Sequence, residues 1–392
     1  MSGAPLKVVQ VGAGGMGRAW LATIAANPDV ELVGLVDLST ATATAAAAGH
    51  GFAAVPVARS VAELLAAGIE VDAVVNVTVP RAHHPVNTAA LAAGLPVLCE
   101  KPLAESVPEC LSMVAAAELS GQLLMVSQSR RYWRAVATLR TQLAELGPVA
   151  AASCQFFKAP HFGGFREEMA YPLLVDMAIH QFDLARLLIG AEPTSVFCRS
   201  YNPSWSWYAG DAAAAVIFEF GDGVTFTFDG SWCAPGKETS WNGAWRFGTA
   251  RGTATWDGDH APLAETDEGV KLPAELPDVP EQIAGSLAEF VATLRARAVG
   301  EDLIPNGEVH TNVLSVAMVE AAVRSAETGQ RVEVATVVQD AYDQALATER
   351  DPRVRGVLAG WTSVLEVVGL GRSDLGRNGS TPAGTLTGSG EV

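Results

Sequence analysis

The residues best placed to do chemistry lie in one apolar segment, residues 173–190. Asp176, His180 and Asp183 occupy positions i, i+4 and i+7, a spacing that puts three ionisable side chains on one face of an α-helix. Because the rest of the segment is nearly all apolar, we expect the helix to be buried, where ionisable groups are costly unless they are partnered. The pattern predicts either a proton-handling site or a buried polar network that fixes packing, and the segment alone leaves both open.

A glycine-rich turn near the N-terminus predicts a nucleotide site. The β-branched run 7–11 leads directly into GAGGMG, and a helical pattern follows. In such a Gly-x-Gly-x-x-Gly motif, Gly12 permits the tight turn, Gly14 lets a pyrophosphate approach the backbone, and Gly17 allows close packing of helix on strand. The helix N-terminus offers free N–H groups to the phosphates. The residues expected to contact the cofactor here are Gly12, Gly14, Gly15, Met16 and Gly17.

The end of the second predicted strand favours NAD over NADP. Asp37 lies twenty residues after Gly17, where a carboxylate accepts hydrogen bonds from the adenosine ribose. The next residues, Leu38 to Thr40, include no arginine that could hold a 2′-phosphate, and the carboxylate would repel one.

Further strands are predicted within 71–80, 95–102 and 123–129, with helices between them, which indicates a doubly wound parallel sheet. Ligands of such sheets lie beyond the carboxyl ends of the strands. The polar and turn residues at those ends are therefore candidates to line the cofactor cleft: Asn76, Thr78, Pro80, Glu100, Lys101 and Arg131.

The pattern changes after residue 129. A helix over 134–146 and a strand over 149–157 precede the Asp/His helix, and a run of strand-like segments with glycine turns follows between 194 and 256. The fold class is therefore α/β: an N-terminal Rossmann doubly wound parallel sheet plus a C-terminal α+β domain with a large, mostly antiparallel sheet. We expect an NAD-binding domain over 1–129, a substrate-binding and oligomerisation domain over 130–336, a helical extension over 337–371 and a disordered tail over 372–392.

Composition excludes several classes of function. The net charge is −17 and the densest basic spot is Arg130-Arg131, so no nucleic-acid or membrane partner is expected. The five cysteines are odd in number and contain no CxxC, which argues against a zinc site and a disulfide framework and favours a cytoplasmic location. No signal peptide or membrane span is indicated. An aromatic-rich, open sheet face makes a homodimer or homotetramer the expected assembly.

These features together resemble the Gfo/Idh/MocA family, the glucose–fructose oxidoreductase and inositol dehydrogenase type of NAD(P)-dependent enzyme, over residues 6–335. The resemblance rests on the glycine motif, NVTVP with His84 four residues after Pro80, Glu100-Lys101-Pro102, the Asp176–His180–Asp183 helix and SAETGQRV at 325–332. It implies that Lys101, Asp176 and His180 converge at the nicotinamide, and it adds His84 to the cofactor site.

The chain departs from the family pattern before the Asp/His helix. Ala170, Tyr171 and Pro172 stand where glycines are common, and Ala178 replaces a glycine between Asp176 and His180. Tyr171 is expected to fill space that other members leave open. The candidate substrate-binding residues are Arg131, Trp133, Lys158, Tyr171 and Asp183.

The residues and the resemblance predict an NAD-dependent dehydrogenase of a sugar, glycoside or cyclitol. His180 suits a general base, Asp176 would orient the substrate hydroxyl or the base, and Lys101 would stabilise alkoxide character. The alternatives are a redox-assisted lyase or glycosidase with transient NAD reduction, reduction of an imine or a non-sugar carbonyl, and a non-catalytic NAD-sensing regulator. A metal site built from Asp176, His180 and His161 is disfavoured, so no metal is expected.

Overall fold

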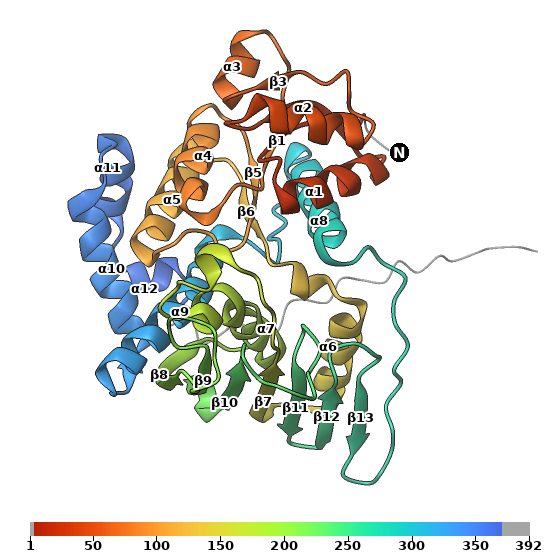
Figure 1. Cartoon of the computed structure of the whole chain (residues 1–392), viewed down its shortest axis with the longest axis vertical. Helices are drawn as coiled ribbons and strands as arrows, with labels where there is room; N and C mark the ends of the chain where they lie inside the picture. The colour runs from red at the N-terminus through yellow and green to blue at the C-terminus, as the bar shows by residue number, and fades with distance from the viewer. Residues whose placement is uncertain (1–3, 371–392) are drawn as a thin grey trace, which may run out of the picture.

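The computed structural model describes residues 4–370, and its N-terminal part is a six-stranded parallel sheet (Figure 1). The strands run in the order β3-β2-β1-β4-β5-β6. Their bounds are β1 Leu6–Val11, β2 Val30–Val36, β3 Val57–Ala58, β4 Ala73–Asn76, β5 Val97–Glu100 and β6 Leu124–Ser127. The connecting helices are α1 Gly15–Ala26, α2 Thr40–Gly49, α3 Val61–Ala66, α4 Pro80–Ala92 and α5 Val107–Ser120. This confirms the predicted Rossmann sheet; the two-residue β3 is too short to show a periodicity in the sequence.

The strand order reverses at β1, which pairs in parallel with both β2 and β4. The turns after β1 and β4 therefore leave on opposite sides and open a crevice at the carboxyl edge of the sheet, the usual ligand position of a doubly wound fold.

The second sheet has eight strands in the order β13-β12-β11-β7-β10-β9-β8-β14, and only β7 and β10 pair in parallel (Figure 1). Their bounds are β7 Val149–Phe157, β8 Pro193–Tyr201, β9 Ala213–Phe220, β10 Thr225–Ser231, β11 Ala244–Thr249, β12 Gly252–Trp256, β13 Leu263–Thr266 and β14 Val332–Glu333. Helices α6 Arg134–Leu146, α7 Ile179–Ile189 and α9 Val309–Thr328 pack against one face over a core rich in phenylalanine. The mostly antiparallel sheet predicted from the sequence is confirmed.

Helix α8, Gln282–Ala298, departs from the predicted domain boundaries. Leu287, Phe290 and Val291 pack into the core formed by α1 and the N-terminal sheet, and Arg295 makes an ion pair with Asp29 at 2.8 Å. The chain thus returns to the nucleotide-binding unit after completing most of the second sheet, because one face of that parallel sheet needs a covering helix.

The C-terminal helices are α10 Val334–Thr348, α11 Pro352–Gly360 and α12 Val364–Val367, and α10 and α11 lie against α5 (Figure 1). The expected tail over 372–392 lies outside the described residues. All five cysteines are buried and free. Within residues 4–370 no helix is long and apolar enough to cross a membrane.

Candidate active site

The glycine loop after β1 is built to hold a phosphate group. A Cβ on Gly12, whose φ is +104°, would lie 2.6 Å from the carbonyl oxygen of Val77, and a Cβ on Gly17 would lie 2.4 Å from that of Gly12. A Cβ on Gly14 would meet no protein atom within 4 Å, so the fold itself does not need glycine there. Helix α1 has no side-chain cap, which leaves its first N–H groups available to an anion. These features fit a dinucleotide pyrophosphate.

Asp37 lies at the same edge of the sheet and touches this loop. Its carboxylate accepts hydrogen bonds from the backbone N–H groups of Ala13 and Ser39, both at 2.9 Å. Leu38 is 77% exposed, and Met16 and Val79 are about half exposed at the neighbouring turns. Such exposed apolar side chains beside a carboxylate fit the adenine and ribose of a dinucleotide.

Asn76 and Glu100 support the cleft from behind instead of lining it. Asn76 is buried, donates to Asn87 at 2.7 Å and accepts from the Thr78 hydroxyl at 2.7 Å. Glu100 is buried and accepts from Trp20 Nε1 at 2.7 Å, and burial raises the pKa of its carboxyl group. Both side chains therefore fix the turns that follow β4 and β5.

His84 and its neighbour His83 have different hydrogen-bond partners. His84 Nε2 lies 2.9 Å from the Ser112 hydroxyl on α5, and the expected contact of His84 with the cofactor stays a prediction. His83 is buried, with its ring nitrogens 2.6 Å from the carbonyl oxygen of Pro102 and 3.1 Å from that of Thr78. The imidazole at position 83 thus joins the turns after β4 and β5. Successive residues of a helix point about 100° apart, so only one of the two can do this.

Lys101 and Asp176 meet across the junction of the two sheets. Lys101 Nζ donates to the backbone carbonyl of Asp176 at 2.9 Å and lies 3.6 Å from its Oδ1. Arg166 Nε binds the other carboxylate oxygen at 2.5 Å. Burial lowers the pKa of Lys101, while Asp176 and Glu100 act against that shift. A buried ammonium of lowered pKa can both stabilise a developing negative charge and pass on a proton.

His180 lies beside this pair with its ring unbonded. Its Nδ1 is buried and has no hydrogen-bond partner. Burial, together with the positive charges of Lys101 and Arg130, holds the pKa of His180 well below its usual value. The imidazole is therefore neutral at pH 7 and able to accept a proton.

The segment before His180 is not the regular α-helix that the sequence predicted. Residues Leu173–Ala178 form a π-helix that leads directly into α7. Its wider turn changes the angular spacing between Asp176 and the residues that follow, and π segments are frequent at functional sites. The predicted single stripe of three ionisable residues is therefore divided.

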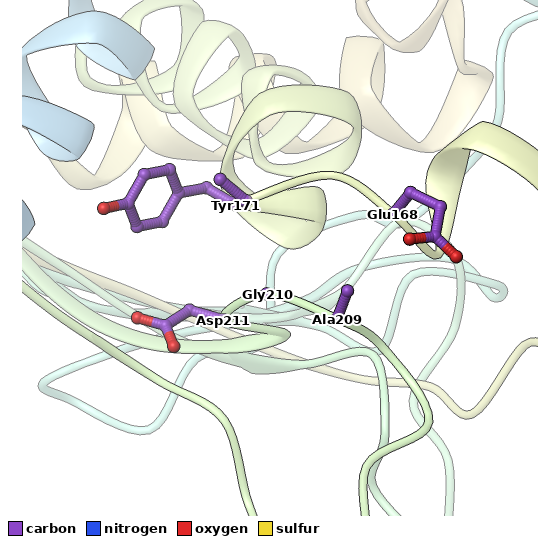
Figure 2. A pocket seen from close by; sticks show the side chains of 6 residues that line it. Glu168, Tyr171, Ala209, Gly210 and Asp211 are labelled. Carbon is purple, nitrogen blue, oxygen red and sulfur yellow. The ribbon is translucent and has the colours of Figure 1, made fainter.

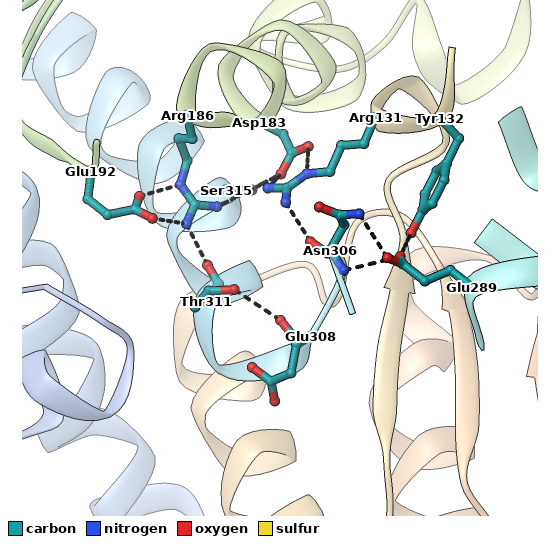
Figure 3. A network of polar contacts seen from close by, with 10 residues as sticks. All are labelled: Arg131, Tyr132, Asp183, Arg186, Glu192, Glu289, Asn306, Glu308, Thr311 and Ser315. Carbon is teal, nitrogen blue, oxygen red and sulfur yellow. Dashed lines mark hydrogen bonds and ion pairs between the residues drawn. The ribbon is translucent and has the colours of Figure 1, made fainter. Parts of the chain in front are cut away.

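Asp183 belongs to a buried polar network (Figure 3). It accepts from Arg131 Nε and Nη2, both at 2.7 Å, and from Ser315 at 2.6 Å, and Arg186 Nη1 lies 3.8 Å away. Arg131 Nη1 also donates to the carbonyl oxygen of Asn306. Because these donors and acceptors satisfy one another, this network does not support the expected substrate contacts of Arg131 and Asp183. Of the two interpretations of the 173–190 segment, a proton-handling site or a buried polar network, Asp183 fits the buried polar network.

Tyr171 borders a surface pocket whose lining does not include His180. Figure 2 shows it beside a surface pocket of about 320 Å³ that also includes Glu168 and Asp211. Burial and the carboxylates of Glu327 and Asp211 raise the pKa of Tyr171. Neither carboxylate belongs to the Lys101–Asp176 pair, so the expected contact of Tyr171 with the substrate is not supported.

The other two substrate candidates have packing partners. Trp133 is the N-cap residue of α6 and packs against the core. Lys158 Nζ binds Glu238 at 2.8 Å and lies 5.2 Å from the ring centre of Trp241. Substrate contact at either residue stays a prediction.

Two arginines of the site were missed by the sequence reasoning. Arg166 comes from the irregular loop after β7 and stacks on Phe162 and Phe165, at 5.3 and 4.9 Å, while it binds Asp176. Arg130 follows β6 and donates through Nη1 to the carbonyl oxygen of Trp241 at 2.5 Å. Arg130 could have been predicted from its position at the end of a strand. No sequence pattern indicated that Arg166 belongs to the site.

A metal-binding arrangement is not present in the part of the chain that the structure describes. Among residues 4–370 no three His, Cys, Asp or Glu side chains lie close enough to hold an ion. His161, considered as a partner of Asp176 and His180, stacks on Trp207 with ring centres 3.8 Å apart.

Comparison with known proteins identifies the family of both domains. Residues 6–128 match the model of the oxidoreductase family with an NAD-binding Rossmann fold, and residues 136–254 match the GFO/IDH/MocA C-terminal domain. Inositol 2-dehydrogenase 4 of Saccharopolyspora erythraea is 34% identical over 51% of this chain and 58% of its own length. The chain spans between 52% and 65% of the length of the first four curated relatives it matches.

Solved structures share the fold over nearly their whole length. GenD2 from gentamicin A biosynthesis, in complex with NAD, is 26% identical with a TM-score of 0.67 over 85% of this chain and 97% of its own. An oxidoreductase from Agrobacterium radiobacter, in complex with NAD+, L-tartaric acid and magnesium, is 20% identical with a TM-score of 0.75 over 84% of this chain and 99% of its own.

Proposed function

We propose, since the chain belongs to the Gfo/Idh/MocA family of oxidoreductases, that it interconverts a secondary alcohol and a ketone on a sugar, glycoside or cyclitol with NAD as the redox partner. One observation carries the proposal. An unbonded neutral His180 lies beside the Lys101–Asp176 pair, at the carboxyl edge of a sheet whose glycine loop fits a dinucleotide. The names of several relatives, which include inositol dehydrogenases and a 1,5-anhydro-D-fructose reductase, support the substrate class.

The glycine loop and Asp37 would hold the cofactor. Gly14 leaves room for the pyrophosphate, the N-terminus of α1 supplies N–H donors, and the Asp37 carboxylate would exchange its bond to Ala13 for the ribose hydroxyls. A 2′-phosphate would bring a dianion against this carboxylate, which favours NAD over NADP. When bound, the nicotinamide accepts or donates the hydride.

The chain's own residues would manage the proton. For oxidation, the substrate hydroxyl gives its proton to His180, whose lowered pKa keeps the imidazole neutral. Lys101 stabilises the negative charge that develops on the same oxygen. Asp176 holds Lys101 in place through its backbone carbonyl and its carboxylate.

A substrate screen with a base-deleted variant tests the proposal. Sugars, glycosides and inositols are offered with NAD, and NADH is followed by absorbance. We expect His180→Ala to lower kcat by about 100-fold or more while NAD binding stays nearly intact. His260→Ala, which removes a histidine that is 83% exposed in its side chain, is the matched control and should keep wild-type turnover.

The same screen separates the competing functions. Product without net NADH would indicate a redox-assisted lyase or glycosidase, and NAD binding without turnover of any compound would indicate a regulator. Wild-type turnover by His180→Ala would refute the assignment of the base.

We also propose that the chain forms a homo-oligomer through the open face of the second sheet. Phe197 and Ile217 pair across β8 and β9 on that face, and each is nearly half exposed. Light scattering of the purified protein measures the assembly, and a monomer at micromolar concentration would refute it.

A further inference from the structure

Arg130 is a largely buried cation that lacks a carboxylate partner. It lies in the 3-10 turn Ser129–Tyr132 after β6 and donates through Nη1 to two neutral oxygens, the carbonyl of Trp241 and Oδ1 of Asn242. Its Nε is buried and unbonded. Within residues 4–370 it makes no ion pair. A buried charge with an unbonded donor is costly unless a ligand compensates it.

The charges around Arg130 do not compensate it. Burial lowers the pKa of Arg130 to about 10, and the one acidic group that acts against the shift is the thiol of Cys154. Burial raises the pKa of that thiol well above its usual value, so it is uncharged. Asp176 is already bound by Lys101 and Arg166. The adjacent Arg131, by contrast, is neutralised by the buried carboxylate of Asp183.

Arg130 lies near His180, because its Nη1 and the side-chain amide of the adjacent Gln181 both donate to the carbonyl oxygen of Trp241. Its positive charge lowers the pKa of both His180 and Lys101. Lys101 and Arg166 share the carboxylate of Asp176, and Glu100 also acts on Lys101, whereas Arg130 has no carboxylate of its own within residues 4–370.

The cofactor phosphates cannot supply the missing anion. The pyrophosphate is expected at Gly14, beyond β1, whereas Arg130 follows β6, and the sheet order places β6 three strands from β1. At about 4.8 Å between strands the two positions are about 14 Å apart. The nicotinamide end of the cofactor carries no negative charge.

We infer that the substrate is an anionic sugar derivative, whose oxyanion group is bound by the guanidinium of Arg130. This rests on the proposed function, because it names the substrate class of the same site. The N–H groups of a guanidinium form a planar fork, a geometry that matches the two oxygens of a carboxylate or a phosphate. The anion would hold the neighbouring CH–OH group between His180 and Lys101.

Charged and uncharged partners of one sugar test the inference. D-glucuronate is compared with its methyl ester, and D-glucose 6-phosphate with D-glucose, by calorimetric titration of the protein–NADH complex. We expect at least one anion to bind about 10- to 100-fold more tightly than its neutral partner, the range for hydrogen bonds to charged groups. The pair that shows the preference distinguishes carboxylate from phosphate.

Variants show whether Arg130 provides the preference. Arg130→Gln should abolish it and Arg130→Lys should keep part of it, while NADH binding reports that both variants are folded. Arg353→Gln is the control, since it deletes a charge from an exposed pair. Equal binding of both members of each pair, or an unchanged preference in Arg130→Gln, would overturn the inference.

The binding and turnover measurements test the anion site and the dehydrogenase proposal separately. NADH formation from neutral sugars without any preference for anions would overturn the inference and leave the dehydrogenase proposal intact. Tight anion binding without NADH formation from any compound would leave the anion site and overturn the dehydrogenase. If Arg130→Gln does not fold, the comparison of charged and neutral ligands on the wild-type protein decides alone.

Discussion

Replacing Asp183 by alanine tests whether this residue stabilises the fold or binds substrate. The side chain is 2% exposed, and it accepts two hydrogen bonds from Arg131 and one from Ser315 (Figure 3). Asp183→Ala leaves the buried guanidinium of Arg131 with the carbonyl of Asn306 alone. Breaking a buried ion pair by removing one partner costs about 3–5 kcal/mol, so we expect a loss of that size in the free energy of unfolding.

Urea unfolding followed by circular dichroism measures this loss, and a matched exposed pair provides the control. Asp278 binds Arg134 at 3.0 Å, but its side chain is fully exposed, so Asp278→Ala should change the free energy of unfolding by less than about 1 kcal/mol. Asp183→Asn should fall between the two, since it keeps an acceptor oxygen and loses the charge. KM of the folded fraction should stay near the wild-type value. Wild-type stability of Asp183→Ala together with a raised KM would refute the reasoning and restore a substrate role.

Three further predictions concern the cofactor loop and the base. Gly17→Ala should destabilise the fold by several kcal/mol, because its Cβ would lie 2.4 Å from a backbone oxygen, whereas Gly14→Ala should fold normally and raise the Kd of NAD; thermal unfolding with and without NAD measures both. Because the pKa of His180 lies well below 6.5, kcat/KM for alcohol oxidation should show no loss from this group between pH 8 and 6.5, and the acid limb should move to higher pH in Arg130→Gln, which removes a charge that lowers this pKa. An acid limb at 6.5 or above in the wild type would contradict the burial argument. Asp37→Ala should weaken NAD binding and relax selectivity against NADP, and unchanged KM values for both cofactors would refute the ribose role.

The amino-acid sequence determined the elements and the nucleotide loop, because these depend on local patterns. The helix predicted over 134–146 and the strand predicted over 149–157 occur with those bounds. The glycines at 12–17 could be interpreted singly, since a tight turn and a close helix–strand contact are made by residues near one another in the chain. Lys101 could be predicted at the end of a strand because that strand is also recognised from a local pattern.

Tertiary structure alone decided which ionisable groups meet. Asp183 finds Arg131 and Ser315, which come from segments 52 and 132 residues away, and no helical spacing contains that information. The π-helix before His180 turns Asp176 toward Lys101 and Arg166, and the pairing of neighbouring strands selects His83 over His84. The role of a polar side chain depends on its burial and on the charges near it. Both are set by packing between segments that are distant in the sequence.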